Sequence, residues 1–125
     1  MREETRNWLL QAEMDLETAE ANIGIKKYFA AAFFSQQAAE KALKALSLEK
    51  FREPLKSHNL LELAKKARVP HEVMRGLMEL NADFIITRYP DAANGLPYEL
   101  YDRQKAEQKT AYARVVLSWA KKQMQ

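Results

Sequence analysis

The sequence predicts an all-α protein, an up-and-down antiparallel helical bundle of four main helices and one short helix. Only three glycines and four prolines occur among its 125 residues. The apolar residues recur at the three- to four-residue spacing of helices and do not alternate as in strands. A chain of this length suits one domain, residues 1–125, whose core buries roughly two thirds of the surface that the unfolded chain exposes.

The first two expected helices are long. The first covers residues 2–23, carries an apolar stripe that begins at Trp8, and is ended by Gly24. The second covers residues 27–51, because Pro54 forbids much further extension. Together they make up the first half of the bundle.

The next two helices are marked by caps and a proline. Ser57 or Asn59 caps the short third helix, and Asn59 has Glu62 in capping-box register. Pro70 closes this helix and suits the first turn of the fourth, whose apolar stripe extends over residues 73–86.

Residues 88–102 form the only long loop expected, and Asp102 then caps the last helix. Loops of this length are often binding elements, although they can also wrap the surface and pin it with aromatic side chains. Three tyrosines in the loop either stack on a nucleobase or cover the core. They are Tyr89, Tyr98 and Tyr101.

A polar line runs along the second helix, which is otherwise nearly apolar and rich in alanine. Gln36, Glu40 and Lys44 recur at i, i+4 and i+8, so they share one face. Either neighbouring helices surround this helix, or its polar line faces a shared site. We expect a mainly architectural role, with hydrogen bonds across a dimer or within one subunit, and keep the three residues as ligand-binding candidates.

Charge is segregated along the chain, whose net charge is +3. Residues 1–25 sum to −4, residues 26–52 to +4, residues 53–102 to −2 and residues 103–125 to +5. Basic segments of this kind attract phosphates, but two oppositely charged helices lying side by side explain the pattern equally well.

Several function classes are excluded by what the sequence lacks. Without cysteine there is no disulfide, thiolate metal site or cysteine nucleophile. The two histidines, His58 and His71, fit no metal-binding motif, and no glycine-rich phosphate loop occurs. We therefore expect no metal and no cofactor. With no signal pattern and no apolar run long enough for a membrane span, we expect a cytoplasmic protein that does not contact the membrane.

Two side chains are candidates for chemistry. His58 is either a general base or a packing or capping residue, and we favour the latter because no carboxylate in an obvious pattern orients its ring. Arg88 stands at a helix end beside Tyr89 and Asp91. There it either holds a phosphate bidentately, or pairs with Asp91 or with helix-terminal carbonyls.

Four segments in order carry a resemblance to a known family. They are Trp8 with Gln11-Ala12 and Asp15-Leu16, Gln36-Gln37-Ala38-Ala39-Glu40-Lys41-Ala42-Leu43-Lys44-Ala45, Ser57-His58-Asn59-Leu60, and Arg88-Tyr89-Pro90-Asp91. On these segments the chain resembles the HEPN domain family. The resemblance implies a homodimeric helical bundle of the prokaryotic cytosol, often encoded beside a minimal nucleotidyltransferase as half of a toxin–antitoxin or stress module.

The catalytic members of that family are metal-independent endoribonucleases with an Arg followed, after four to six residues, by a His paired across the dimer. Arg88 would be this Arg, but Asn94 occupies a permitted slot for the His. Asparagine cannot exchange protons as imidazole does in cleavage assisted by a 2′-hydroxyl. Arg52 and His58 show the same spacing, but they lie after the second helix, and chance explains that match.

We therefore expect a non-catalytic domain that binds a nucleotide or an RNA phosphate and partners a minimal nucleotidyltransferase. The alternatives are a metal-independent endoribonuclease toxin and a structural or scaffold dimer. The catalytic candidates are Arg88, His58 and Asn94. The ligand-binding candidates are Arg88, Tyr89, Asp91, Tyr98, Tyr101, Gln36, Glu40 and Lys44.

Overall fold

A computed structural model describes residues 1–52 and 56–125, and this part of the chain is helical, with no strand. The predicted all-α class is confirmed. No helix within these ranges is both long and apolar enough to cross a membrane. The elements are α1 Glu3–Gly24, α2 Tyr28–Phe51, α3 Leu60–Ala67, α4 His71–Asn81, α5 Asp83–Ile86, α6 Pro90–Ala93, the 3₁₀ turn η1 Pro97–Glu99, and α7 Arg103–Gln123.

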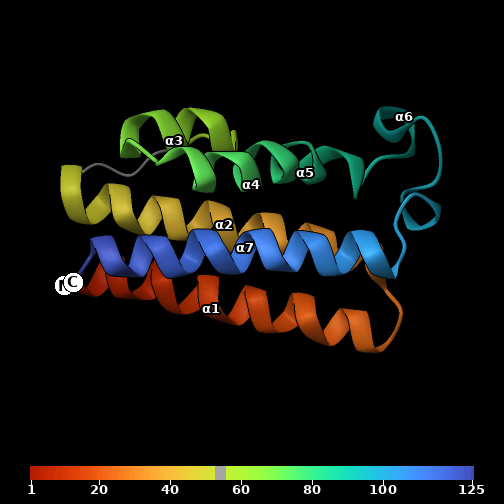
Figure 1. Ribbon diagram of the computed structural model, residues 1–125, viewed down its shortest axis with the longest axis horizontal. Coiled ribbons are helices and arrows are strands. Elements are labelled where there is room, and N and C mark those ends of the chain that lie inside the picture. Colours follow the sequence, from red (N-terminus) through yellow and green to blue (C-terminus); the bar gives the residue numbers. More distant parts are fainter. Residues whose placement is uncertain (53–55) are drawn as a thin grey trace.

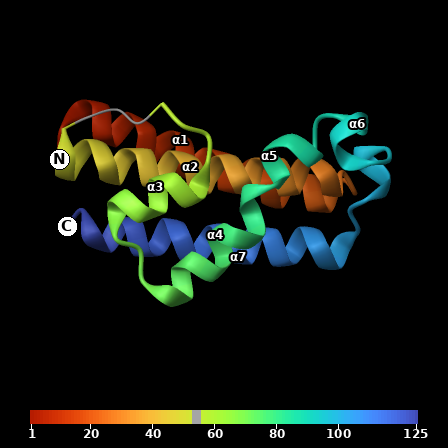
Figure 2. The ribbon, with the colours of Figure 1, turned by 90° about the horizontal axis from the view of Figure 1, so that it is seen from above.

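Three long helices, α1, α2 and α7, lie alongside one another (Figure 1). The shorter helices α3, α4 and α5 cover one side of α2 and α7, and α6 with η1 stands at one end (Figure 2). Both chain termini lie at the other end, together with the last turn of α2. Taken in chain order, α1, α2, α4 with α5, and α7 alternate in direction, as the predicted up-and-down bundle requires.

Helix α2 is surrounded by its neighbours, packing on α1, α3, α5 and α7. Every residue from Ala42 to Leu48 is buried. The core around α2 is made of leucine, valine and alanine from α1, α2, α3, α4 and α7, including Leu16, Leu43, Leu77 and Val116. Alanine makes this possible, since its small side chain allows helices to approach closely. The first of the two readings of this helix is therefore correct.

The predicted helix caps are present. The Asn59 side chain accepts hydrogen bonds from the amides of Leu61 and Glu62, at 2.9 and 3.4 Å. Ser57 precedes this cap and accepts from the Asn59 amide, which therefore has a partner other than Glu62. The Asp102 side chain likewise accepts from an amide in the first turn of α7. Pro54, expected to limit α2, lies outside the described residues.

Two expected elements differ from the structure. The fourth helix is broken at Ala82, and the side chain of Asn81 at the break accepts a hydrogen bond from the Leu60 amide. The expected long loop contains two short helical turns, each with a proline in its first turn, where the missing amide is not needed. Asn94 ends the first of these turns in the left-handed conformation, with φ 56°.

The segregated charges face each other in the fold. Arg114 of α7 pairs with Glu20 of α1 at 2.9 Å, and Lys121 pairs with Glu13. Acidic α1 and basic α7 thus lie side by side, as one of the two interpretations of the charge pattern proposed.

Candidate functional site

The polar line on α2 is hydrogen-bonded within one subunit. Gln36 is fully buried, and its Nε2 donates to Glu40 Oε1 at 3.2 Å. Lys44 Nζ donates to Glu40 Oε2 at 3.1 Å. The side chains of Glu40 and Lys44 are only 4% and 8% exposed. The carboxylate of Glu40 is therefore the centre of a buried polar group and needs no second subunit to be satisfied.

The imidazole of His58 also binds Glu40. Its Nδ1 lies 3.0 Å from Glu40 Oε2, and since a carboxylate accepts, Nδ1–H is the donor. The expectation that no carboxylate orients this ring is wrong. The carboxylate comes from a residue 18 positions earlier, because α3, which begins two residues after His58, packs on α2. The His58 side chain is 56% exposed, so its Nε2 is available for a ligand.

Phe84 on α5 joins His58 to Arg88. The His58 ring stacks on the Phe84 ring, with centroids 4.6 Å apart and planes 12° from parallel. The Arg88 guanidinium carbon lies 4.0 Å from the centroid of the same ring. Sequence reasoning assigned Phe84 only to the apolar stripe of its helix. We call Gln36, Glu40, Lys44, His58, Phe84 and Arg88 the His58–Arg88 cluster.

The Arg88 side chain is exposed, and it is hydrogen-bonded through Nε. Its Nε donates to the Phe84 carbonyl at 2.9 Å, so it does satisfy a helix-terminal carbonyl. The guanidinium also lies 5.9 Å from the Phe33 ring centroid and 5.0 Å from that of Tyr89. Within residues 1–52 and 56–125, no carboxylate forms an ion pair with the guanidinium, and the expected pair with Asp91 is therefore absent. Its terminal N–H groups have no hydrogen-bond partner in the same ranges.

A hollow of about 540 Å³ opens beside the cluster, lined by His58, Asn59, Asn81, Phe84 and Ile85 among others. Small-molecule sites commonly have volumes of this order, with apolar walls and a few polar groups. The hollow lies between the start of α3 and the junction of α4 with α5. It therefore offers space for a ligand next to the exposed face of His58.

Comparison with known proteins identifies the family. The model of the HEPN domain family matches residues 5–123. The chain belongs to the HEPN domain family. A search of curated protein sequences gave no significant match.

Several solved structures share this fold. The protein TT1696 from Thermus thermophilus is 32% identical, with a TM-score of 0.91 over 98% of this chain and 99% of that one. ST0689, described as an archaeal HEPN homologue, is 32% identical, with a TM-score of 0.86 over the whole of both chains. The HEPN domain protein TM0613 from Thermotoga maritima is 26% identical, with a TM-score of 0.73 over 93% and 95%.

In this HEPN domain the loop tyrosines differ in exposure. Tyr89 and Tyr98 are 45% and 61% exposed, and Tyr89 adjoins Arg88. Tyr101 is buried, and its hydroxyl donates to Asp83 Oδ1 at 2.5 Å. Ligand binding by Tyr101 stays a prediction, to which this position lends no support.

Tyr101 belongs instead to a group that fastens α5 to the start of α7. Lys109 Nζ lies 2.9 Å from the second carboxylate oxygen of Asp83. Burial raises the pKa of Asp83, although the Tyr101 hydroxyl and Lys109 oppose that rise. Burial and the hydrogen bond to Asp83 raise the pKa of Tyr101 as well. Because Asp83 precedes Phe84, this group helps to position the cluster.

The other predicted residues, Asp91 and Asn94, are exposed near α6. Asn94 is the left-handed cap of that turn, a conformation that asparagine adopts more readily than most residues. Its position is one of the slots after Arg88 in which the family resemblance implied a histidine for a catalytic member. Within the described ranges, no three His, Cys, Asp or Glu side chains gather as metal ligands would.

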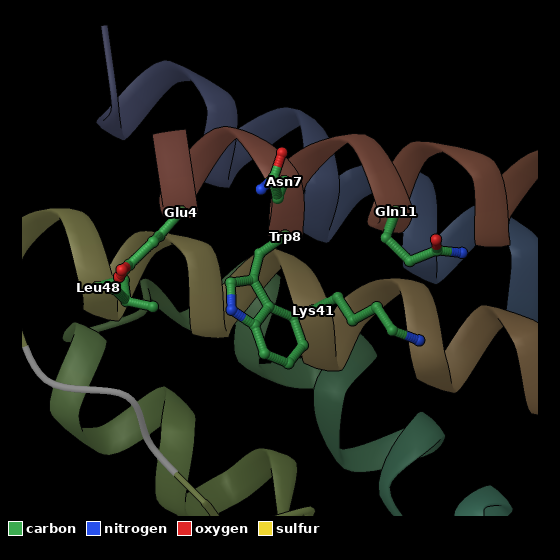
Figure 3. A pocket seen from close by; sticks show the side chains of 6 residues that line it. All are labelled: Glu4, Asn7, Trp8, Gln11, Lys41 and Leu48. Atoms are coloured by element: carbon green, nitrogen blue, oxygen red, sulfur yellow. The ribbon is translucent and has the colours of Figure 1, made fainter. Parts of the chain in front are cut away.

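A second hollow lies between α1 and α2. Figure 3 shows the Trp8 ring lying from α1 across α2, with Lys41 beside it and Glu4, Asn7, Gln11 and Leu48 around them. Lys41 Nζ donates to Asp15 and to Gln37, whose Nε2 donates to Gln36 Oε1. The hydrogen bonds thus continue from this groove to the His58–Arg88 cluster.

Proposed function

We propose that this HEPN domain binds the phosphate of a nucleotide or of RNA at the His58–Arg88 cluster. The observation that carries the proposal is Arg88. Its guanidinium is exposed, has no carboxylate partner in the described part of the chain, and lies against Phe84, the ring on which His58 stacks. A planar, always charged guanidinium with open N–H groups suits bidentate binding of a phosphate.

The neighbouring groups support an anionic, aromatic ligand. Glu40 carries negative charge next to the site, but Lys44 is paired with it and offsets its repulsion. His58 Nε2 offers a further polar contact on the exposed side of the ring. The rings of Phe33 and Tyr89 lie near Arg88 and provide faces on which a base can stack.

The proposal is tested with Arg88→Ala. We expect affinity for a 5′-mononucleotide or a short RNA to fall about tenfold, since a charge-assisted hydrogen bond contributes roughly 1.5–3 kcal/mol. The matched control is Arg75→Ala, which removes an exposed arginine from α4, outside the cluster. Melting temperature and oligomeric state should stay unchanged. Unaltered affinity of Arg88→Ala would exclude Arg88 and favour the scaffold reading.

We further propose that the domain is a homodimer in the cytoplasm and the non-catalytic partner of a minimal nucleotidyltransferase in a toxin–antitoxin or stress module. Membership of the HEPN family supports this part. Sedimentation equilibrium tests the dimer. Co-expression with a nucleotidyltransferase encoded next to this gene tests the partner, and separate elution of the two proteins would argue against it.

The pair of His58 and Glu40 favours a second candidate, metal-independent cleavage of RNA. A carboxylate that accepts from Nδ1 fixes the tautomer in which Nε2 is the basic nitrogen, as a general base requires. The purified protein would then cleave RNA in the presence of a chelator. His58→Ala and Arg88→Ala should each abolish this cleavage. A wild-type protein that does not cleave RNA would exclude this second function.

A further inference from the structure

A chain of side-chain hydrogen bonds crosses α2 and joins the hollow between α1 and α2 to His58. Lys41 lines that hollow (Figure 3), and its Nζ donates to Gln37 Oε1 at 3.2 Å. Gln37 Nε2 donates to Gln36 Oε1 at 2.8 Å, and Gln36 Nε2 donates to Glu40 Oε1 at 3.2 Å. The other oxygen of that carboxylate accepts from the His58 ring.

The direction of this chain is fixed by its two ends. The ammonium of Lys41 can only donate, and the carboxylate of Glu40 can only accept. Gln37 must therefore turn its carbonyl oxygen toward Lys41, which leaves its amide N–H groups for Gln36. Gln36 in turn must accept from Gln37 and donate to Glu40. If either amide were turned over, two donors or two acceptors would face each other.

Lys41 is held as the donor of the chain by Asp15 of α1. The two side chains form an ion pair and are 20% and 5% exposed. The second carboxylate oxygen of Asp15 accepts from Gln11 at 2.9 Å, so both of its oxygens are bonded. A neighbouring helix thus fixes the end of the chain that lies far from His58 in sequence.

The other end of the chain holds the carboxylate that orients His58. Gln36 occupies Oε1 of Glu40, and Oε2 is left for the imidazole. A reversed chain would bring the Gln36 carbonyl against Oε1, and the carboxylate would turn away from His58 because two acceptors repel. We propose that Lys41 and Gln37 are positioning residues for His58, which act through Gln36 and Glu40 and select the Nδ1–H tautomer of its ring.

The test is Gln37→Glu, a change of nearly equal size that reverses the second half of the chain. A glutamate can only accept, so residue 37 keeps its bond from Lys41 and gains an ion pair at i, i+4. Gln36 must then donate to residue 37 and turn its carbonyl toward Glu40. We expect the ratio of the Nδ1–H to the Nε2–H tautomer of His58 to fall about fivefold, as the loss of one net hydrogen bond gives.

The ratio is measured by NMR of the ¹⁵N-labelled full chain, since the shift of a ring nitrogen depends on whether it carries a proton. The spectra are recorded without ligand at about pH 8.5, where an ordinary imidazole is neutral. The ring of His71, which is exposed on α4, is the internal control and should not change in any variant.

Two variants serve as matched controls. Gln11→Glu makes the same substitution beside the same hollow, but it lies beyond Lys41 and leaves the direction of the chain unaltered. Lys41→Arg keeps a side chain that can only donate. Both should retain the wild-type tautomer ratio at His58. Lys41→Met removes the donor without adding a charge and leaves both amides free to turn over, so the ratio should fall in this variant too.

The outcomes separate positioning from folding and from the function proposed above. A lower ratio in Gln37→Glu, at a melting temperature equal to that of the wild type, supports the proposal. It would be overturned by a wild-type ratio in Gln37→Glu, by an equal fall in Gln11→Glu, or by equal ratios in Lys41→Met and Lys41→Arg. Only a change in nucleotide affinity rests on the proposed function. A wild-type protein that binds no nucleotide would contradict that function alone, because the ring is observed without ligand.

Discussion

At the scale of single residues, Glu40 connects most of the candidate site. Its carboxylate accepts hydrogen bonds from Gln36, Lys44 and His58, and it is almost completely buried. One residue thus satisfies a buried cation and orients an exposed imidazole. The polar line on α2 has a structural role, as expected, and it also reaches the surface through His58.

Glu40→Gln should therefore destabilise the protein and disturb His58. Removing one partner of a buried ion pair leaves the other uncompensated, so we expect a loss of about 3 kcal/mol in the free energy of unfolding, measured with urea. The double variant Glu40→Gln with Lys44→Met removes both charges and should recover part of that loss. No recovery would show that the pair with Lys44 is not the cause.

Phe84 should matter for binding more than for folding. Phe84→Leu keeps an apolar side chain in the partly buried position but removes the ring shared by His58 and Arg88. We expect about a fivefold loss of nucleotide affinity, since a cation–π contact contributes about 0.5–1 kcal/mol at an exposed site. Phe29→Leu, in a partly buried ring outside the cluster, serves as the control in the same titration. Equal affinity in the two variants would contradict the role of Phe84.

At the scale of elements, Asp83 fastens α5 to α7 and gives a prediction on pH. Its pKa is raised in the folded state, mainly by burial, so the folded protein binds its proton more readily than the unfolded chain. The stability that this proton contributes is complete below the ordinary aspartate value of 3.8 and is lost as pH rises through the raised pKa.

Urea denaturation of the wild type and of Asp83→Asn at several pH values measures this loss. The stability of the wild type relative to the variant should decline as pH rises from about 4, because asparagine does not titrate. If the free energies of unfolding of the wild type and of Asp83→Asn differ by the same amount at every pH, the burial of an ionisable group at Asp83 would be contradicted.

Features that depend on neighbours in sequence were predictable, and those that depend on tertiary contacts were not. The caps at Asn59 and Asp102 follow from local hydrogen bonding, and both are present. The hydrogen bond between Glu40 and His58 joins α2 to the start of α3, and no pattern in the sequence around either residue predicts it. The break at Ala82 was missed because the apolar stripe of the fourth helix continues through it.

At the scale of the whole molecule, the charge pattern of the sequence corresponds to a packing arrangement of the helices. Acidic α1 and basic α7 face each other, which accounts for Arg114 and Lys121 through their partners Glu20 and Glu13. The segregation seen in the sequence is therefore explained in part by two oppositely charged helices that lie side by side.

The contact between α1 and α7 should tolerate exchange of its charges. Glu20 and Arg114 are about half exposed, so reversing either charge should cost less than about 1 kcal/mol. The double reversal, Glu20→Arg with Arg114→Glu, should restore stability in a double-mutant cycle followed by thermal melting. Additive losses would show that the two residues do not interact in solution.

The proposed function requires that a phosphate binds beside Arg88 and His58. The most direct measurement is a titration of the ¹⁵N-labelled protein with a 5′-mononucleotide, followed by NMR. We expect the largest shifts at the Arg88 Nε–H, at the His58 ring and at the backbone amides of residues 84–89. The largest shifts outside these groups, or no shifts at saturating nucleotide, would contradict the proposed phosphate site.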